Sequence, residues 1–355
     1  MEGNKAGNDV LSVRQVMVLL SVALLAPATD LLPTAAAQQV GKGGWLIGLG
    51  ALPVMLLALW VGSRVFCGKG VCQTVGRPVG YTIIIIYLLW ILFVLAAVLR
   101  LSAARMEAVY GRLPSFCFSV VAAAVAVWMG MGKAASFARA AEIFCLALAV
   151  VLVGVLLLGL FHVKWQNLYP VEWTRLPAGS FRSAGILLNV VPIAVLGARI
   201  SQKTRNKQKV CGWVAAFCVA TTFMLVAVLG CVGSGLSARL EIPYFIMVQG
   251  LGIKGAFQRT EALVAALWLL SDLILCAALL CAGRDYAAQI TSRKWGKRSV
   301  PLLGAAALAA GWLLFPSGRV REFCMEVLPV TGLVLGICFP AFLWMLSRER
   351  AKNRR

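Results

Sequence analysis

The residues most able to do chemistry in this sequence are carboxylates inside long apolar runs. Asp30 stands between Pro27 and Pro33 in the stretch LLAPATDLLPTAA at 24–36. Asp272 lies in LWLLSDLILC, and no Lys or Arg shares its apolar run. A carboxylate at the middle of a membrane costs about 2.5–3.5 kcal/mol, so such a residue indicates a function or a specific partner.

The prolines beside Asp30 show how a polar site could form there. Proline has no N–H, so Pro27 and Pro33 each leave a backbone carbonyl without its helical partner. In lipid, such loose backbone is tolerated where it lines a polar cavity or packs inside protein. The ends of half-helices attract groups of both signs, which suits a small zwitterion. We therefore predict a ligand or ion site at Pro27, Ala28, Thr29 and Asp30.

Asp30 also has a structural interpretation, as a helix cap or a charge facing a water-filled vestibule. Pro33 suits the first position of a second half-helix, which would make Leu32 the cap and leave Asp30 just outside. Capping alone is therefore the weaker account, and a site for a cation, an ammonium group or a proton is the alternative.

A second interrupted run, SAGILLNVVPIAVLGA, carries Asn189 and Pro192 near its centre. We predict that Asn189 and Val190 contact the ligand and that Pro192 breaks the helix. Ser271 and Asp272 are predicted to be ligand contacts or part of a proton relay, and a hydrogen bond between helices is the alternative.

The composition indicates that a membrane surrounds these residues. The 355-residue chain is 61% hydrophobic with a mean hydropathy of +0.87, whereas soluble domains carry about 45–50% apolar residues. Apolar runs long enough to cross a bilayer recur along it. We predict an all-α polytopic membrane protein whose ten transmembrane helices cover about 13–37, 45–63, 80–104, 114–130, 138–161, 182–200, 210–233, 259–282, 300–316 and 324–346.

The distribution of charge predicts the topology. An even number of spans places both termini on one side. The net charge is +21, and most of the 34 Lys and Arg residues fall on that side, with dense clusters at 205–209 and 293–298 and in the tail at 347–355. Basic loops stay in the cytoplasm, so both termini are predicted to be cytoplasmic. Anionic membrane lipid accounts for the clusters, and nucleic acid is not predicted as a partner.

The ten spans divide into two sets of five, at about 13–161 and 182–346. Because five is odd, a duplicated five-helix unit inserts with inverted topology, which is typical of transporters. The interrupted spans 1 and 6 then correspond. We therefore predict a single transmembrane domain over 1–355, built as a leucine-transporter-type 5+5 inverted repeat.

Metal and enzyme chemistry have little support. The 11 Cys lie mostly within apolar segments, and His162 is the single histidine. We predict no metal, cofactor or disulfide framework. The sequence contains no P-loop and no Ser/His/Asp arrangement, so no enzyme is predicted.

Several acids at the ends of spans have an arginine close by in the sequence. Arg139 lies three residues before Glu142 on the same helical face, which predicts a structural ion pair. Two further acids resemble this pair: Glu107 with Arg105 nearby, and Glu261 with Arg259 nearby.

Four segments resemble the spore germination permease family, the B subunit of germinant receptors in the amino acid–polyamine–organocation superfamily. They are LSVRQVMVLL, GKGGWLIGLG, GKAASFARAAEI and EIPYFIMVQGLGIKGAFQRTEALVAALW, in the order that the family has. The matching positions, most of which look structural, are Pro33, Trp45, Gly132, Arg139, Glu142, Pro243, Arg259 and Glu261.

This resemblance implies a ten-span fold of the leucine-transporter type in the spore inner membrane. It also implies A-type and C-type receptor subunits as partners and a small nutrient such as an amino acid as ligand. The chain departs from the family in span 6, where Ile-Ala-Val follows Pro192 in place of a Phe-Gly-Glu-like run. Asp30 and Asp272 stand where apolar or small residues are expected.

Three functions agree with these patterns. The first is a receptor subunit that senses a nutrient without moving it. The second is a proton- or sodium-coupled amino-acid permease, which Asp30 and Asp272 favour. The third is a passive channel for ions or water.

Overall fold

The computed structural model describes residues 10–65, 77–111, 114–200, 207–251, 260–291, 293–315 and 319–352. The described helices, in chain order, are α1 (Val13–Asp30), α2 (Leu32–Val40), η2 (Gly41–Leu46), α3 (Ile47–Gly50), α4 (Leu52–Val65), α6 (Arg77–Tyr110), α7 (Ser115–Met131), α8 (Ala134–Phe161), η3 (Trp165–Asn167), α9 (Leu176–Leu188), η4 (Val191–Arg199), α10 (Lys207–Val232), α11 (Ser234–Ser237), α12 (Pro243–Gly250), α13 (Thr260–Ile290), α14 (Arg293–Leu314), α15 (Val320–Leu333), η6 (Val334–Cys338) and α16 (Phe339–Lys352).

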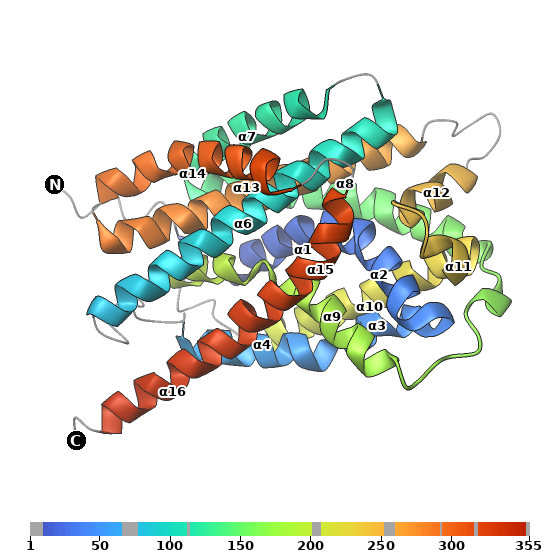
Figure 1. Cartoon of the computed structure of the whole chain (residues 1–355), viewed down its shortest axis with the longest axis horizontal. Helices are drawn as coiled ribbons and strands as arrows, with labels where there is room; N and C mark the ends of the chain where they lie inside the picture. Colours follow the sequence, from blue (N-terminus) through green and yellow to red (C-terminus); the bar gives the residue numbers. More distant parts are fainter. Residues whose placement is uncertain are drawn as a thin grey trace.

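The fold is all-helical, as the apolar runs predict, because a helix satisfies its own backbone groups in lipid. The long helices α6, α13, α14 and α7 pack against one another (Figure 1). α1 packs on α8 and α13, and α9 packs on α15. In the described residues the only bridge between extended segments joins Leu11 and Ile200.

Seven described helices are long and apolar enough to cross a membrane, or eight if the bent pair α9 and η4 counts as one span. Leu32–Val65 counts as one apolar helical stretch, although it includes parts of predicted spans 1 and 2. α7 is shorter, at 17 residues. The integral, multi-pass character is therefore clear, whereas the number ten stays a prediction.

Both predicted interruptions are present. The break in the first span is a single residue, Leu31, between α1 and α2. Pro27 lies inside α1 and does not end it, and Leu31 rather than Leu32 caps α2, which the prediction had wrong. The reason is that Leu31 keeps helical angles and its N–H still bonds the carbonyl of Pro27 at 3.1 Å. The second interrupted span, predicted span 6, bends by 50° between α9 and η4, beside Pro192.

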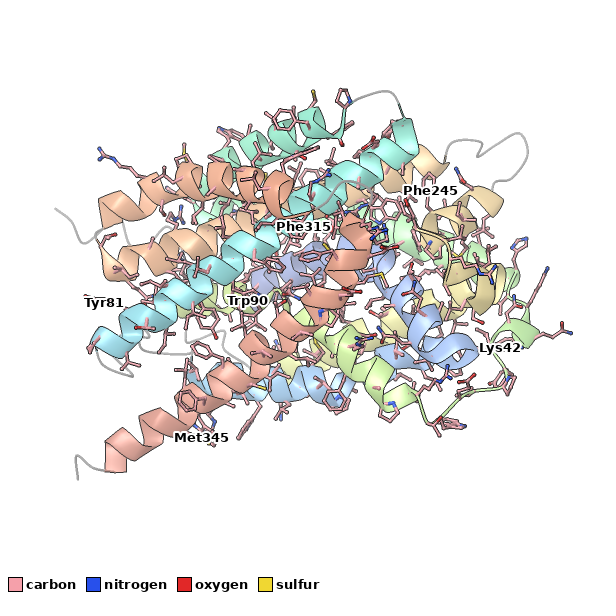
Figure 2. The ribbon with its side chains drawn as sticks, viewed as in Figure 1. Lys42, Tyr81, Trp90, Phe245, Phe315 and Met345 are labelled. Atoms are coloured by element: carbon pink, nitrogen blue, oxygen red, sulfur yellow. The ribbon has the colours of Figure 1, made fainter. Side chains whose placement is uncertain are left out.

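The molecule has two opposite ends. One end, which we call the N-terminal face, holds the start of α1, where Leu11 N–H bonds the carbonyl of Arg199 at 3.1 Å. Arg199 Nε also bonds Asp285 Oδ2 at 2.8 Å, which ties η4 to α13. The other end, the far face, holds α11, α12 and the end of α2. Figure 2 shows Lys42 on the far face, and Tyr81 toward the opposite end.

α9 and α15 approach closely because both carry glycine where they cross. A Cβ on Gly332 would overlap the carbonyl oxygen of Gly185, and a Cβ on Gly185 would overlap that of Pro329. Small residues at such a crossing allow two backbones in a membrane to touch. This contact fixes α15 against the first half of the bent span.

We expect Gly332→Ala to lower the free energy of unfolding by about 1–3 kcal/mol, because overpacking forces the backbones apart. Gly154→Ala is the matched control, since a Cβ there meets nothing within 4 Å and both variants gain the same helix propensity. Thermal unfolding of the purified protein in detergent measures the difference. Equal melting temperatures of the two variants would contradict the packing argument.

Candidate functional site

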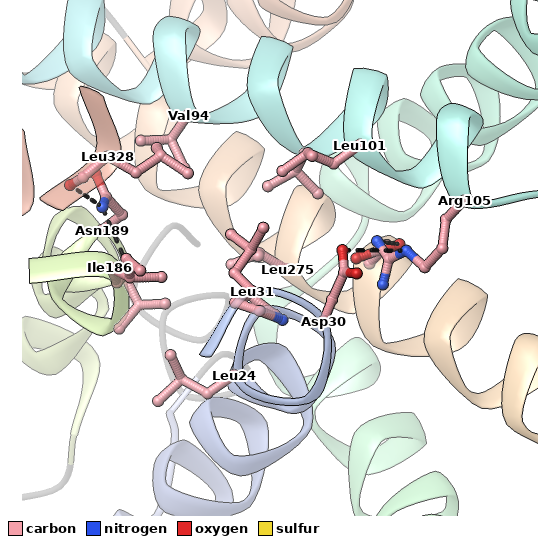
Figure 3. A pocket seen from close by; sticks show the side chains of 14 residues that line it. Leu24, Asp30, Leu31, Val94, Leu101, Arg105, Ile186, Asn189, Leu275 and Leu328 are labelled. Carbon is pink, nitrogen blue, oxygen red and sulfur yellow. Dashed lines mark hydrogen bonds and ion pairs between the residues drawn. The ribbon is translucent and has the colours of Figure 1, made fainter. Parts of the chain in front are cut away.

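A small cavity lies at the centre of the bundle, between the two interrupted spans (Figure 3). Its volume is about 30 Å³. Four polar side chains line it: Asp30, Arg105, Asn189 and Asp272. The rest of the lining is Leu24, Pro27, Leu31, Val94, Val98, Leu101, Ile186, Val190, Leu275 and Leu328. The cavity is thus apolar in its middle, with polar groups at its two ends.

Two carboxylates and two guanidinium groups meet beside the cavity, and we call Asp30, Arg105, Asp272 and Arg321 the charge cluster. Asp30 comes from the last residue of α1, Arg105 from α6, Asp272 from α13 and Arg321 from α15. Arg105 Nη2 bonds Asp272 Oδ2 at 2.9 Å. Arg105 Nε also lies 3.5 Å from Asp30 Oδ2. Arg105 therefore joins the two acids that the sequence singles out.

Arg321 completes the charge cluster from the other side. Its Nη2 bonds Asp30 Oδ1, and its Nη1 bonds the Asp30 carbonyl at 3.0 Å. The side chains of Asp30 and Arg105 are each only 2% exposed, whereas that of Arg321 is 17% exposed. Two positive and two negative groups leave the cluster neutral, which is what burial in a low-dielectric interior requires.

Arg105 keeps unused hydrogen-bonding capacity. Its Nη1 and Nε atoms are buried, and neither donates a hydrogen bond within the described part of the chain. The guanidinium carbon lies 5.3 Å from the ring centroid of Trp268, a cation–π distance. Buried donors normally have a partner. Arg105 is therefore the group in the lining most suited to bind an acceptor on a ligand.

Asn189 closes the opposite end of the cavity and is heavily engaged. Its amide nitrogen donates to the carbonyl of Leu328 at 2.8 Å and to that of Gly185 at 3.0 Å. Its oxygen accepts from Trp90 Nε1 at 3.0 Å and from Thr331 Oγ1 at 3.2 Å. Asn189 thus links α6, α9 and α15, and its role in this structure is to hold the bend.

Ser271 bonds to α1 just before its proline. Its hydroxyl accepts from the N–H of Ala26 at 2.9 Å and donates to the carbonyl of Val22 at 2.6 Å. In a regular helix these two groups bond each other, so the hydroxyl of Ser271 joins α13 to the turn of α1 that precedes Pro27. One turn further on, Trp268 Nε1 donates to Thr29 Oγ1 at 2.7 Å.

Five of the eight predicted ligand contacts line the cavity: Pro27, Asp30, Asn189, Val190 and Asp272. The other three do not: Ala28, Thr29 and Ser271. Ser271 and Thr29 instead join α1 to α13 through the bonds above, which is the alternative that the sequence left open for Ser271. Asp272 has a cationic partner after all, because α6 supplies one from outside its own apolar run.

The predicted ion pair of Arg139 and Glu142 is replaced by other contacts in the structure. Arg139 does not pair with Glu142, so that prediction is wrong: Arg139 Nε bonds the carbonyl of Ala135 at 3.1 Å. Glu142 pairs with Arg14 of α1 at 3.0 Å. The packing of α1 on α8 places Arg14 within ion-pair distance of Glu142. Arg105 likewise turns into the charge cluster, away from the neighbouring Glu107.

The predicted structural positions Arg259 and Glu261 lie outside the described part of the chain, Glu261 by its side chain only. Pro33 is the second residue of α2 and Pro192 the second of η4, where proline starts a helix at no cost in hydrogen bonds.

The sequence reasoning missed Arg105 and Arg321. Both lie just beyond the apolar runs as these were delimited, and both fall inside longer helices. The rule that a buried acid pairs with a cation could have led to them. It could not have said which arginine among 34 basic residues was the partner.

A larger hollow opens on the far face, and we call it the vestibule. It has a volume of about 770 Å³ and lies between α2, α9, α15 and residues 238–241. Arg321 lines the vestibule and also bonds Asp30, which lines the cavity. The Asp30–Arg321 pair is therefore part of the wall between them.

The volumes of the cavity and the vestibule indicate the size of molecule that each could hold. A volume of about 30 Å³ can hold a water molecule, which needs roughly 10–15 Å³ by this measure. It is far below the roughly 300–1,000 Å³ of pockets that hold small ligands. The cavity thus has room for a water molecule and not for a small organic ligand, whereas the vestibule is open. No cluster of three or more metal-ligating side chains occurs among the described residues.

Comparisons with known proteins come from sequence and from structure. The sequence model of a family described as "Spore germination protein" matches residues 10–313. No curated protein sequence matches the chain. The crystal structure of MhsT in complex with L-phenylalanine is similar, with a TM-score of 0.64 and 11% sequence identity. The match covers 95% of this chain and 89% of MhsT, which shows a shared leucine-transporter-type fold.

We expect Arg105→Gln to cost about 3–5 kcal/mol of stability, because it leaves one buried negative charge uncompensated. The double variant Arg105→Gln/Asp272→Asn removes one charge of each sign and should be more stable than Arg105→Gln alone. Thermal unfolding of the single and double variants measures this. A double variant whose loss equals the sum of the two single losses would contradict a charge-balanced cluster.

The matched control is the exposed pair of Arg14 and Glu142, whose side chains are 79% and 21% exposed. Arg14→Gln and Glu142→Gln should each change stability by about 0–1 kcal/mol, as water screens such pairs.

Proposed function

Because the chain belongs to the spore germination protein family, we propose that it is a B-type subunit of a spore germinant receptor. It recognises a small nutrient, an amino acid by preference, in the central cavity. Binding widens the cavity and moves the helices that line it, and this movement signals germination. No catalytic step is part of the proposal.

The observation that carries the proposal is the free donor capacity of Arg105 inside a neutral charge cluster. A guanidinium group with unused N–H donors suits the carboxylate of an amino acid. The apolar middle of the cavity, with Leu24, Leu31 and Val94, suits a small apolar side chain. Asp30 or Asp272 then meets the ammonium group. The ligand requires more room than the cavity has, so binding is coupled to a change of conformation.

The second candidate is a proton- or sodium-coupled amino-acid permease, which the intramembrane carboxylates Asp30 and Asp272 favour. MhsT was crystallised with L-phenylalanine, and at 11% identity the likeness supports the fold alone. Coupling to Na⁺ or H⁺ would use a carboxylate that lacks a cation. Asp30 and Asp272 each have an arginine partner, so a coupling ion would have to displace that arginine, as the ammonium group of a nutrient would.

The location and partners follow from the same proposal. The chain is integral to the spore inner membrane, with both termini in the cytoplasm and the far face outside, as the basic loops suggest. Its ten spans form the 5+5 inverted repeat, over about 13–161 and 182–346 of the single domain. A-type and C-type subunits complete the receptor.

The test is genetic. Deletion of the gene should abolish the germination of spores in response to at least one nutrient of a panel of amino acids and sugars, and the wild-type gene should restore it. Asp30→Asn should lower the germination rate about tenfold or more, and by more than it lowers the level of the protein in the membrane, since a hydrogen bond to a charged group contributes about 1.5–3 kcal/mol. Glu142→Gln serves as the control.

Two outcomes would overturn the proposal. One is a deletion strain that responds normally to every nutrient. The other is uptake of labelled amino acids by proteoliposomes of the purified chain under an imposed H⁺ or Na⁺ gradient, which would establish the permease instead. Loss of Asp30→Asn from the membrane would assign Asp30 a structural role.

A further inference from the structure

The segment that joins α8 to α9 carries three exposed aromatic rings. We call residues 162–175 the far-face linker, and Figure 1 shows it as the green segment at the right-hand edge that leads into α9. Trp165 is 65% exposed, Tyr169 52% and Trp173 68%. Tryptophan is highly buried on average in folded proteins. Three open rings so close together therefore indicate a surface that another molecule covers.

The far-face linker is held firmly to the rest of the bundle. The N–H of Lys164 donates to the carbonyl of Gly230 at 3.1 Å, and Asn167 Nδ2 donates to the same oxygen at 2.9 Å. A Cβ on Gly43 would lie 2.8 Å from Val171 Cγ1, which shows how closely the linker packs on η2. The rings are thus exposed because the fold presents them there.

The neighbouring helix α8 shows at what depth in a membrane the linker lies. From Ile143 to Phe161, every exposed residue of α8 is apolar or glycine. These two residues are 18 positions apart, which is about 27 Å of helix. That length matches the hydrocarbon core of a bilayer, which is roughly 30 Å thick. Glu142, with its ion pair, directly precedes this apolar face, and His162 directly follows it.

Aromatic and basic residues begin where the apolar face of α8 ends. Lys164 and Trp165 come within four positions of Phe161, and Tyr169 and Trp173 follow. Trp and Tyr collect at membrane–water interfaces, because their rings are apolar and each carries one polar group. A lysine there keeps its stem on apolar surface and its charge in the polar layer. Depth, ring type and charge therefore agree on the headgroup layer.

The two other placements of the far-face linker are unfavourable. In bulk water, three large rings would expose apolar area that gains from leaving water. In the hydrocarbon core, the irregular backbone between η3 and α9 would have exposed polar groups without water to bond them. The exposed charge of Lys164 would also be costly there.

We propose that the far-face linker is a lipid-binding surface, whose partner is the headgroup layer of the membrane leaflet at the far face. Trp165, Tyr169 and Trp173 lie among the headgroups. Because the linker leads directly into α9, this layer sets the depth of the first half of the bent span. The inference concerns lipid alone and holds whichever molecule the central cavity binds.

Tryptophan fluorescence of the full-length chain tests the depth of the rings. The protein is reconstituted in vesicles of phosphatidylcholine and phosphatidylglycerol in equal parts, with bromine atoms either near the headgroups or near the ends of the acyl chains. The emission lost in Trp165→Phe or Trp173→Phe is that of the ring removed. The shallow bromines should remove most of this emission, whereas the deep bromines and iodide in the water should remove little. If one variant does not fold, the other gives the same test.

Trp268→Phe is the matched control, because Trp268 is 1% exposed. The emission lost in that variant should respond to none of the three quenchers. Quenching of Trp165 and Trp173 by iodide alone would overturn the proposal and would mark the linker as a surface for a soluble partner. Stronger quenching by the deep bromines would overturn it as well, because the rings would then lie in the hydrocarbon core.

Discussion

The neutrality of the charge cluster, three of whose four members are buried, is the constraint on which this structure depends. Asp30 and Asp272 are tolerated at the centre of a membrane protein only because Arg105 and Arg321 form ion pairs with them. To bring these groups together, four helices must meet at one level, namely α1, α6, α13 and α15. Three features bring the groups together. α1 ends at Asp30, next to the break at Leu31; α6 continues beyond its apolar run to include Arg105; and α15 begins beside Asp30 with Arg321. The cavity lies beside it for the same reason.

Much of the architecture could be predicted from the sequence because apolar runs and prolines act locally. The helical, multi-pass fold follows from run length, and the two interruptions follow from Pro33 and Pro192. Asp30, Asp272 and Asn189 stand out for the same reason, as polar residues in apolar surroundings. Five predicted contacts line one cavity, since interrupted helices that are packed together leave room at the same depth.

The pairing of side chains across the bundle depends on which helices face each other. The pattern of apolar runs and prolines in one sequence does not show which helices these are. Arg105 looked like the neighbour of Glu107, and its actual partner is 167 residues away. Glu142 binds Arg14, 128 residues away, and not the arginine one turn before it. Asn189 carries the signature of a ligand contact, yet its amide is occupied by α6, α9 and α15. In each case a long-range contact outweighed a local one.

The hydroxyl of Ser271 has a mechanical consequence. It fastens the first half of the interrupted span to α13, while Thr34 and Gln38 fasten α2 to the segment at 238–241. Leu31 thus separates two helices that are held by different neighbours. α1 is attached to α13 inside the bundle, and α2 is attached to residues 238–241 at the far face. A displacement of residues 238–241 can therefore move α2 while α1 stays in place. The interrupted span then flexes at its Asp30 end and does not move as one rigid helix.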